Sequence, residues 1–402
     1  VLEAPPGAGK TTQVPLALLR EPWLKDQKIL MLEPRRVAAR AAAEFMSAQL
    51  GEAAGGRVGY RIRFEAKVSA RTQIEVLTEG ILTRLIQSDP ELRGVGAIVF
   101  DEFHERHLHS DFGAALALEV QASLRPDLRL LVMSATLDGE RIARWLDAPR
   151  LTSAGRSFPV HIEYPIAKTQ EEWPLYLRRV VQQALRETEG DLLVFLPGRR
   201  EIERARTVLA ALSTDVVPAS LEWVVLHGEL SLTEQYAALR PAAVGQRRVV
   251  LATNVAETSV TVEGITAVVD TGLARTQMFD ASVGMDRLEL SPIGRDAADQ
   301  RAGRAGRTQP GVCVRLWTEA SHAHRAGRTA PEIFRVDLAG ALLQLLAIGE
   351  SDVSDLDHQR NLQNFSKLSY VPICIQGVTG NHDALNDSGS QVNLIMRDLL
   401  QQ

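Results

Sequence analysis

The sequence has 402 residues, which is more than one ordinary core organises, so length alone suggests two domains. Apolar residues make up 45% and charged residues 24%, and these values exclude a mainly disordered, collagenous or disulfide-scaffold protein. The formal net charge of −5 argues against wholesale attraction to nucleic acid, although a local basic cleft is compatible with it.

The sequence contains no apolar run of about 18 residues and no secretory segment, so we expect no association with a membrane. The chain begins at Val1 rather than Met, which leaves open a targeting segment ahead of it. Cys313 and Cys374 lie too far apart for a metal motif, and two cysteines do not form a disulfide framework. A reducing cytoplasm and a monomeric state are the expectations.

Short apolar runs alternate with longer helix-like segments, a pattern typical of parallel sheets covered by helices. The predicted strands, in chain order, are Val1–Glu3, Ile29–Leu32, Ala97–Phe100, Leu130–Met133, Leu192–Phe195, Val249–Ala252 and Ala267–Val269. The predicted helices include Val37–Leu50 and Phe112–Leu124. The alternation lapses around Ser153–Pro159, which puts a domain boundary near residue 156.

The first strand is followed by a glycine-rich run typical of a phosphate-binding loop. It consists of Ala4, Pro5, Pro6, Gly7, Ala8, Gly9, Lys10, Thr11 and Thr12. The glycines let backbone N–H groups turn toward phosphate oxygens, and the following helix adds its dipole. Lys10 would bind the β- and γ-phosphates and Thr11 would ligate Mg²⁺, so we predict a nucleotide triphosphate and Mg²⁺ here. The alternative is a simple glycine turn before a helix.

A carboxylate pair, Asp101 and Glu102, follows the apolar run Ala97–Phe100. Asp101 would hold Mg²⁺ and Glu102 would polarise the attacking water. The alternative is a solvated turn, which the phosphate loop disfavours. A metal site made of His104, His107 and His109 is also disfavoured, because no Cys or second acidic cluster completes it.

With these motifs in place, the chain resembles the DEAH/RHA-type superfamily 2 ATP-dependent helicases, in particular their bacterial HrpB type. The resemblance spans about residues 1–350. Its further motifs are Glu33–Arg36, Thr78–Gly80, Ser134–Thr136, Phe195–Gly198, Ala252–Ser259 and Gln300–Arg307. The resemblance implies an α/β fold with two tandem RecA-like domains, ATP in the cleft between them, and nucleic acid across both. It implies domains over 1–156 and 157–325, the start of a winged helix over 326–357, and an unassigned tail over 358–402.

The resemblance also assigns roles. His104 would belong to the catalytic motif, Gln300 would position the attacking water, and Arg304 and Arg307 would act as arginine fingers, although surface arginines are the alternative. Ser134 and Thr136 would relay the nucleotide state, unless they only cap a helix. The expected contacts to the nucleic-acid backbone are Arg35, Arg36, Thr78, Arg199, Thr253 and Asn254. Each of these is also compatible with an ordinary surface or cap role.

Other segments follow from the same resemblance. Arg275–Leu290 is expected to be a β-hairpin that separates strands, with a structural hairpin as the alternative. Val336–Leu346 would be the first helix of the winged helix. Phe45 stands where relatives often carry an arginine near adenine. Its side chain could stack on the base or face the core, and we favour the core. Asparagine occurs once before residue 358 and five times after it, so the tail is either a different module or foreign to the ancestral frame.

The leading hypothesis is therefore an ATP-dependent RNA helicase core that uses Mg²⁺. The alternatives are a DNA or RNA/DNA-hybrid motor and a non-catalytic nucleic-acid-binding remnant. RNA, single-stranded or as a duplex with an overhang, is the expected partner, DNA is a possible one, and a protein activator is compatible with the family.

Overall fold

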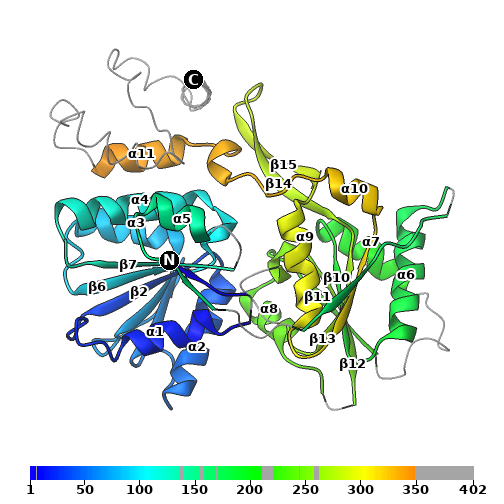
Figure 1. Cartoon of the computed structure of the whole chain (residues 1–402), viewed down its shortest axis with the longest axis horizontal. Helices are drawn as coiled ribbons and strands as arrows, with labels where there is room; N and C mark the ends of the chain where they lie inside the picture. Colours follow the sequence, from blue (N-terminus) through cyan, green and yellow to red (C-terminus); the bar gives the residue numbers. More distant parts are fainter. Residues whose placement is uncertain are drawn as a thin grey trace.

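The computed structural model describes residues 1–5, 7–135, 139–153, 158–168, 170–210, 221–243, 245–257 and 262–348. These residues form two sheet domains that lie side by side (Figure 1). In this part of the chain no helix is both long and apolar enough to cross a bilayer.

The first domain is built on an eight-stranded sheet with the order β4-β3-β5-β2-β6-β7-β1-β8, in which neighbouring strands are parallel except β3 and β4. Its strands are β1 (Leu2–Glu3), β2 (Lys28–Glu33), β3 (Val58–Ile62), β4 (Glu65–Lys67), β5 (Ile74–Thr78), β6 (Val95–Phe100), β7 (Arg129–Ser134) and β8 (Leu151–Thr152). Figure 1 shows α1 (Lys10–Leu18) and α2 (Arg36–Gln49) on one face, and α3 (Glu79–Ser88), α4 (Leu108–Ser123) and α5 (Gly139–Trp145) on the other.

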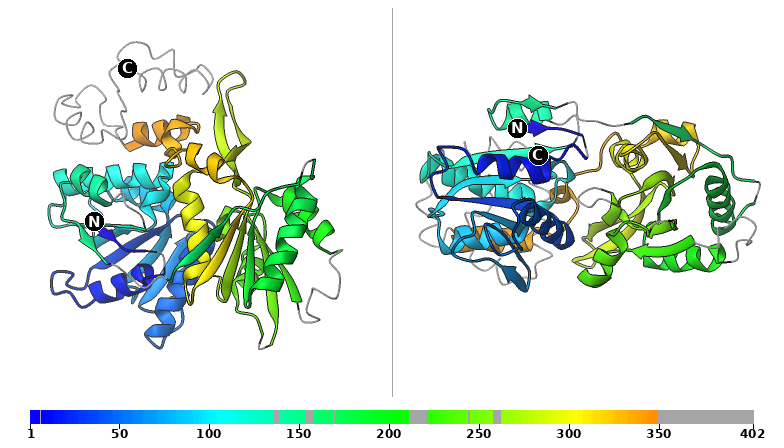
Figure 2. Two further views of the ribbon diagram at one scale, coloured as in Figure 1. Left: turned by 45° about the vertical axis from the view of Figure 1, so that its right-hand side comes forward. Right: turned by 90° about the horizontal axis from the view of Figure 1, so that it is seen from below.

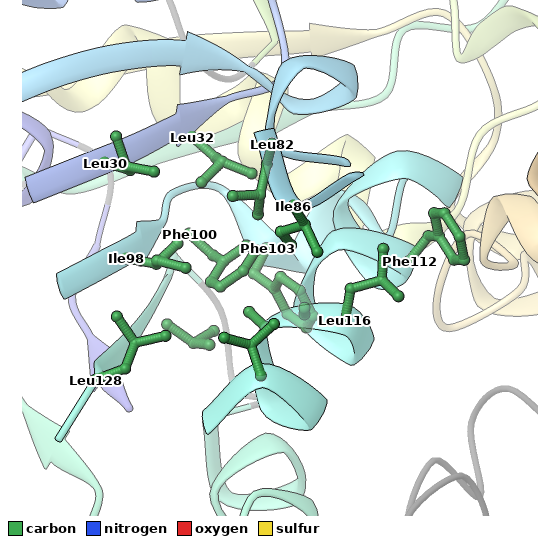
Figure 3. Close-up of a cluster of buried hydrophobic side chains, with 14 of the residues drawn as sticks. Leu30, Leu32, Leu82, Ile86, Ile98, Phe100, Phe103, Phe112, Leu116 and Leu128 are labelled. Carbon is green, nitrogen blue, oxygen red and sulfur yellow. The ribbon is translucent and has the colours of Figure 1, made fainter. Parts of the chain in front are cut away.

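Both faces of this sheet are covered, which explains the near-continuous apolar runs of its central strands. Alternate residues of β2 enter different cores: Leu30 and Leu32 pack with α3 and α4, whereas Ile29 and Met31 pack toward α2. Figure 3 shows the first of these clusters, in which Phe103 lies beside Phe100. The residue after Glu102 is thus fixed in the core.

The second domain contains a six-stranded parallel sheet with the order β11-β12-β10-β13-β16-β9. Its strands are β9 (Val160–Glu163), β10 (Asp191–Phe195), β11 (Leu221–Leu226), β12 (Arg247–Ala252), β13 (Ile265–Asp270) and β16 (Gly311–Arg315). Its helices are α6 (Trp173–Glu187), α7 (Arg199–Leu209), α8 (Leu232–Leu239), α9 (Arg295–Ala302) and α10 (Glu319–His324). Short 3-10 turns follow β6 (Phe103–Glu105) and β12 (Asn254–Ala256), and a third follows α9 (Gly303–Gly306).

An antiparallel hairpin of β14 (Leu273–Asp280) and β15 (Met285–Pro292) projects from the second domain. After α10 the chain returns to the first domain through a 3-10 turn (Glu332–Phe334) and α11 (Ala339–Ile348), whose Leu345 packs on the core beside α3. In Figure 1 and in the left view of Figure 2, the hairpin and α11 rise on the same side of the molecule.

Every strand predicted from the apolar runs is confirmed, and so is the hairpin. The helix predicted from Val37 begins one residue earlier, at Arg36, and two other helices differ more at their starts. Helix α4 begins four residues before the predicted Phe112. The sequence pattern does not reveal this first turn, because its polar residues Ser110 and Asp111 are buried with polar partners. Helix α11 begins at Ala339 rather than Val336, where the Asp337 carboxylate accepts a hydrogen bond from the Ala339 N–H at 2.7 Å.

The predicted domain boundaries stay predictions. Residue 156 lies outside the described residues; β8 before it belongs to the first sheet and β9 after it to the second. The start of a winged helix over 326–357 also stays a prediction. The described residues of this range contain one 3-10 turn and α11. The tail 358–402 lies outside the described residues.

Candidate nucleotide site and nucleic-acid groove

The predicted phosphate loop connects β1 to α1. Gly7 and Gly9 have φ angles of +83° and +81°, a left-handed conformation in which a side chain is strained. Gly9 precedes the first residue of α1, so the unpaired N–H groups of that helix start lie at the loop. Ala8 lies in the turn and Thr12 in the first turn of α1, whereas Pro6 lies outside the described residues. The backbone is therefore shaped to receive an anion.

The strand end that carries Asp101 and Glu102 meets this loop directly. The Thr11 hydroxyl donates a hydrogen bond to Asp101 Oδ2 at 2.5 Å, and Asp101 Oδ1 accepts one from the Glu102 N–H at 2.8 Å. Lys10 Nζ lies 3.5 Å from Glu102 Oε1, with both side chains buried. Burial, and then the neighbouring Glu102 charge, raise the pKa of Asp101. These four residues form one compact polar cluster.

A third carboxylate, Glu33, belongs to this cluster and was not predicted from the sequence. It is 1% exposed, and burial followed by the charges of Asp101 and Glu102 raises its pKa well above the usual range. A signal did exist, because Glu33 ends β2, the parallel neighbour of the strand that ends in Asp101. Its Oε2 atom has no hydrogen-bond partner in the described structure, and the same holds for Glu102 Oε2.

The buried carboxylate oxygens without hydrogen-bond partners fit a divalent cation with oxygen ligands. Within the described ranges, no group of three or more His, Cys, Asp or Glu side chains is arranged to hold a metal by itself. Mg²⁺ usually keeps several waters and binds through one or two protein ligands together with substrate phosphates. Thr11 and Asp101 therefore suit Mg²⁺ that is bound together with a nucleotide.

His104 connects Glu102 to the end of β7. Its Nδ1 accepts a hydrogen bond from the Ala135 N–H at 3.3 Å and lies 3.4 Å from Glu102 Oε2. The first contact needs the Nδ1 lone pair, whereas an ion pair with Glu102 needs a proton on that nitrogen. The two contacts therefore compete for one ring nitrogen. The adjacent Ser134 is buried at the end of β7, and Thr136 lies outside the described residues.

Two arginines of the second domain face this cluster. Burial lowers the pKa of Arg304 well below its usual range and that of Arg307 to about 10, and the Glu102 charge opposes the shift in both. Glu102 in the first domain is therefore within electrostatic reach of both guanidinium groups. Lys10 lies 3.5 Å from the same carboxylate, so Glu102 interacts with the predicted lysine of its own domain and with the two predicted arginines of the other.

Glu257 and Arg301 hold this arginine segment in place, and sequence reasoning assigned neither of them. The Glu257 carbonyl accepts a hydrogen bond from Arg304 Nε at 2.9 Å. Arg301 is 1% exposed and pairs with Glu257 at 2.8 Å and with Asp270 at 2.9 Å. Paired buried charges of this kind fix orientation, because removal of one partner leaves the other uncompensated. The sequence did offer a signal for Arg301, which lies within the predicted motif Gln300–Arg307. Its side chain pairs with Asp270 at the end of β13.

Predicted nucleic-acid contacts gather on the second domain. Arg199, Thr253 and Asn254 line one groove of about 800 Å³, together with Arg200, Arg275, His227 and Leu288. Arg199 is exposed and pairs with Glu229 at 3.0 Å. Asn254 also lines a second cavity of about 480 Å³ between the domains, together with Arg35, His104 and Gln300.

The first-domain contacts are arranged differently. Arg35 pairs with Glu105 at 2.9 Å inside the interdomain cavity. Arg36 is exposed at the start of α2, and Thr78 precedes α3 without a side-chain cap. Neither Arg36 nor Thr78 lines the groove that contains Arg199. Their roles stay predictions.

The favoured core position of Phe45 is wrong, because its side chain is 54% exposed. The buried face of α2 instead carries small residues and Met46, which pack on the sheet. The same helix contacts the second domain, where Tyr236 donates a hydrogen bond to the Val37 carbonyl at 3.3 Å and Arg40 lies over the Tyr236 ring at 5.0 Å. The contact between α2 and α8 thus joins the two domains.

Two family models match the chain: the DEAD/DEAH box helicase model over residues 1–145 and the helicase conserved C-terminal domain over residues 176–309. The chain is 45% identical over 358 residues to the ATP-dependent RNA helicase HrpB of Escherichia coli, covering 89% of this chain and 44% of that protein. It is 41% identical to the pre-mRNA-splicing factor ATP-dependent RNA helicase prp22 of Schizosaccharomyces pombe, covering 89% of this chain and 31% of that one.

Two crystal structures of E. coli HrpB superpose with TM-scores of 0.78 and 0.82 at 42% identity. Each superposition covers 96% of this chain and 48% or 49% of the other. The chain therefore spans less than half the length of these relatives, and its described part shares their two-domain α/β fold.

Proposed function

The chain belongs to the DEAD/DEAH box helicases, and from this premise we propose that it hydrolyses ATP between its two sheet domains and uses the energy to move on or unwind RNA. The observation that carries the proposal is that Arg304 and Arg307 of the second domain are buried within electrostatic reach of Glu102 in the first. A base and two cationic groups from opposite domains form a site that is complete only when the domains close.

The chemistry follows from the geometry. The phosphate loop and Lys10 bind the triphosphate, with Thr11 and Asp101 as the residues that would hold Mg²⁺. Mg²⁺ supplies charge neutralisation on the phosphate oxygens when it is bound. Glu102 accepts the proton of the attacking water, and Gln300 orients that water from the second domain. Arg304 and Arg307 stabilise the charge that develops on the transferred phosphoryl group, a contribution of about 10³–10⁵ in rate in well-studied systems.

The groove lined by Arg199, Thr253 and Asn254 suits a sugar–phosphate backbone. Guanidinium, hydroxyl and amide groups donate hydrogen bonds to phosphate oxygens without reading base identity. Asn254 borders both this groove and the interdomain cavity that contains His104 and Gln300. Nucleic acid bound there is therefore adjacent to the residues that sense ATP.

The test is steady-state ATP hydrolysis without nucleic acid, with single-stranded RNA and with single-stranded DNA, at low salt so that phosphate contacts are strong. We expect RNA to stimulate turnover, and EDTA and the Glu102→Gln variant each to abolish it. If only DNA stimulates turnover, DNA rather than RNA is the substrate. Full turnover in Glu102→Gln would overturn the catalytic assignment.

A further inference from the structure

The segment Pro331–Leu338 joins the catalytic loop of the first domain to the hairpin of the second. On the first domain, the Glu332 N–H donates to the Arg106 carbonyl at 3.0 Å. The Glu332 Oε2 atom accepts a hydrogen bond from the Leu108 N–H at 2.9 Å. Glu332 is thus hydrogen-bonded to Arg106 and to Leu108, on the two sides of His107 in the turn that directly follows the Asp101–Glu105 motif.

The hydrogen bond from Leu108 to Glu332 supplies a partner for an N–H group in the first turn of α4. Leu108 is its first residue, and the N–H groups of a first turn have no partner within the helix. The preceding His107 gives no side-chain cap, so the Glu332 carboxylate caps α4 from more than 200 positions away in sequence. A carboxylate there also complements the helix dipole. Arg106 has a φ of +51°, so the same contact fixes a turn with a strained backbone.

Apolar packing reinforces the attachment. Ile333, Val336 and Leu338 are buried in one cluster with Leu108 and Ala115, and Trp145 packs against it. The Trp145 ring also stacks on Phe103, with ring centroids 6.4 Å apart. Because Phe103 follows Glu102 directly, the segment contacts the catalytic loop through a second, independent path.

The other side of the segment is bonded to the hairpin. The Arg335 carbonyl accepts a hydrogen bond from the Phe279 N–H at 2.6 Å, and Arg335 Nη1 donates to the Gln277 carbonyl at 3.0 Å. The Asp337 N–H donates to Asp286 Oδ1 at 3.0 Å, so both hairpin strands are held. The Glu332 carboxylate lies 3.4 Å from Arg335 Nη2, which connects the two sets of contacts.

We infer that Glu332 is a positioning residue that links the catalytic loop to the hairpin, so that a change at the ATP site reaches β14 and β15 through residues 331–338. The inference rests on the proposed function. It adds a specific residue and path that transmit the nucleotide state.

Hydrogen exchange without nucleotide tests the link independently of turnover. We expect Glu332→Ala to speed exchange both at the start of α4 and in hairpin residues 277–286, and Glu332→Gln to restore slow exchange because its amide oxygen still accepts the Leu108 hydrogen bond. The matched control is Glu319→Ala, which removes an exposed acid from the first turn of α10. Faster exchange confined to α4 would overturn the link.

Kinetics tests the coupling in the same proteins. We expect Glu332→Ala to lower the RNA-stimulated kcat about tenfold with KM for ATP within about twofold, and Glu332→Gln to stay near the wild type. A wild-type kcat in Glu332→Ala would overturn the positioning role. If the wild-type protein hydrolyses no ATP while Glu332→Ala speeds exchange in both regions, the proposed function fails and the physical link stands.

Discussion

The Lys10 ammonium lies 3.5 Å from a carboxylate oxygen of Glu102, and both side chains are almost fully buried. Lys10 is the residue proposed to bind phosphate and Glu102 is the proposed base, so we expect phosphate and the Glu102 carboxylate to compete for one ammonium group. We therefore expect bound phosphate to weaken this pair.

The Glu102→Gln variant tests this competition. We expect ATP to bind at least as tightly as in the wild type, because a neutral amide competes less for Lys10, while turnover falls by about 10²–10⁴ through loss of the base. Equilibrium binding of a fluorescent ATP analogue and steady-state hydrolysis measure the two effects. Glu21→Gln, on an exposed turn, is the control. Weaker ATP binding in Glu102→Gln would contradict the competition.

Arg307 supplies a second prediction, because its pKa is lowered only to about 10 and its charge is retained at neutral pH. We expect Arg307→Lys to bind ATP normally but to lose about 10³ in kcat, since a lysine point charge does not reproduce the planar donors of a guanidinium group. Arg84→Lys, on the exposed face of α3, is the control for the loss of an arginine. Equal rates in the two variants would exclude a finger role for Arg307.

The sequence allowed prediction of the sheets and of the cluster at their carboxyl ends. Buried parallel strands produce continuous apolar runs, and the residues that end them, such as Asp101 and Ser134, necessarily meet at one edge. Glycine at Gly7 and Gly9 has a local steric reason. These parts depend on local pattern, which one sequence contains.

Tertiary partners were not predictable in the same way. Glu332 caps a helix whose first residue lies more than 200 positions earlier, and Arg301 finds Asp270 and Glu257 only after folding. A charged residue is expected to be exposed unless a partner for it is known, and the sequence does not show that partner. The exposure of Phe45 likewise depends on tertiary packing, because small residues and Met46 fill the buried face of its helix.

The groove residue Arg199 gives a third prediction. Its ion pair with Glu229 is exposed on both sides, and such pairs contribute little to stability. We expect Arg199→Ala to weaken binding of single-stranded RNA and to reduce the slope of log K against log salt by about 0.7, the value for one phosphate contact. Glu229→Gln should strengthen RNA binding, because it releases Arg199 from its partner. Fluorescence anisotropy over a salt series measures both.

Two outcomes would contradict this assignment. An unchanged salt slope in Arg199→Ala would place the RNA phosphates elsewhere, with Arg200 as the adjacent candidate in the groove. Weaker binding in Glu229→Gln would mean that the carboxylate itself contacts the ligand.

The relay from Arg35 through Glu105 to His107 predicts a dependence of stability on pH. Burial opposes protonation of His107, but hydrogen bonds to Glu105 and Glu79 overcome it and raise the pKa well above the usual 6.5. Burial likewise opposes ionisation of Glu105, but Arg35 and His107 overcome it and lower the pKa of Glu105 below the usual 4.5. Both partners are therefore charged in the folded protein near neutral pH.

The sign follows from linkage. A raised histidine pKa contributes stability that is complete below pH 6.5 and is lost as pH rises through the folded value. The lowered Glu105 pKa contributes stability that is complete above pH 4.5 and is lost as pH falls through the folded value. We therefore expect the melting temperature of the wild type to exceed that of His107→Gln most between pH 4.5 and 6.5, and the difference to shrink at higher pH. His109→Gln, which replaces an exposed histidine in the first turn of α4, should show no such trend. A difference that grows with pH would mean that His107 is neutral in the folded protein.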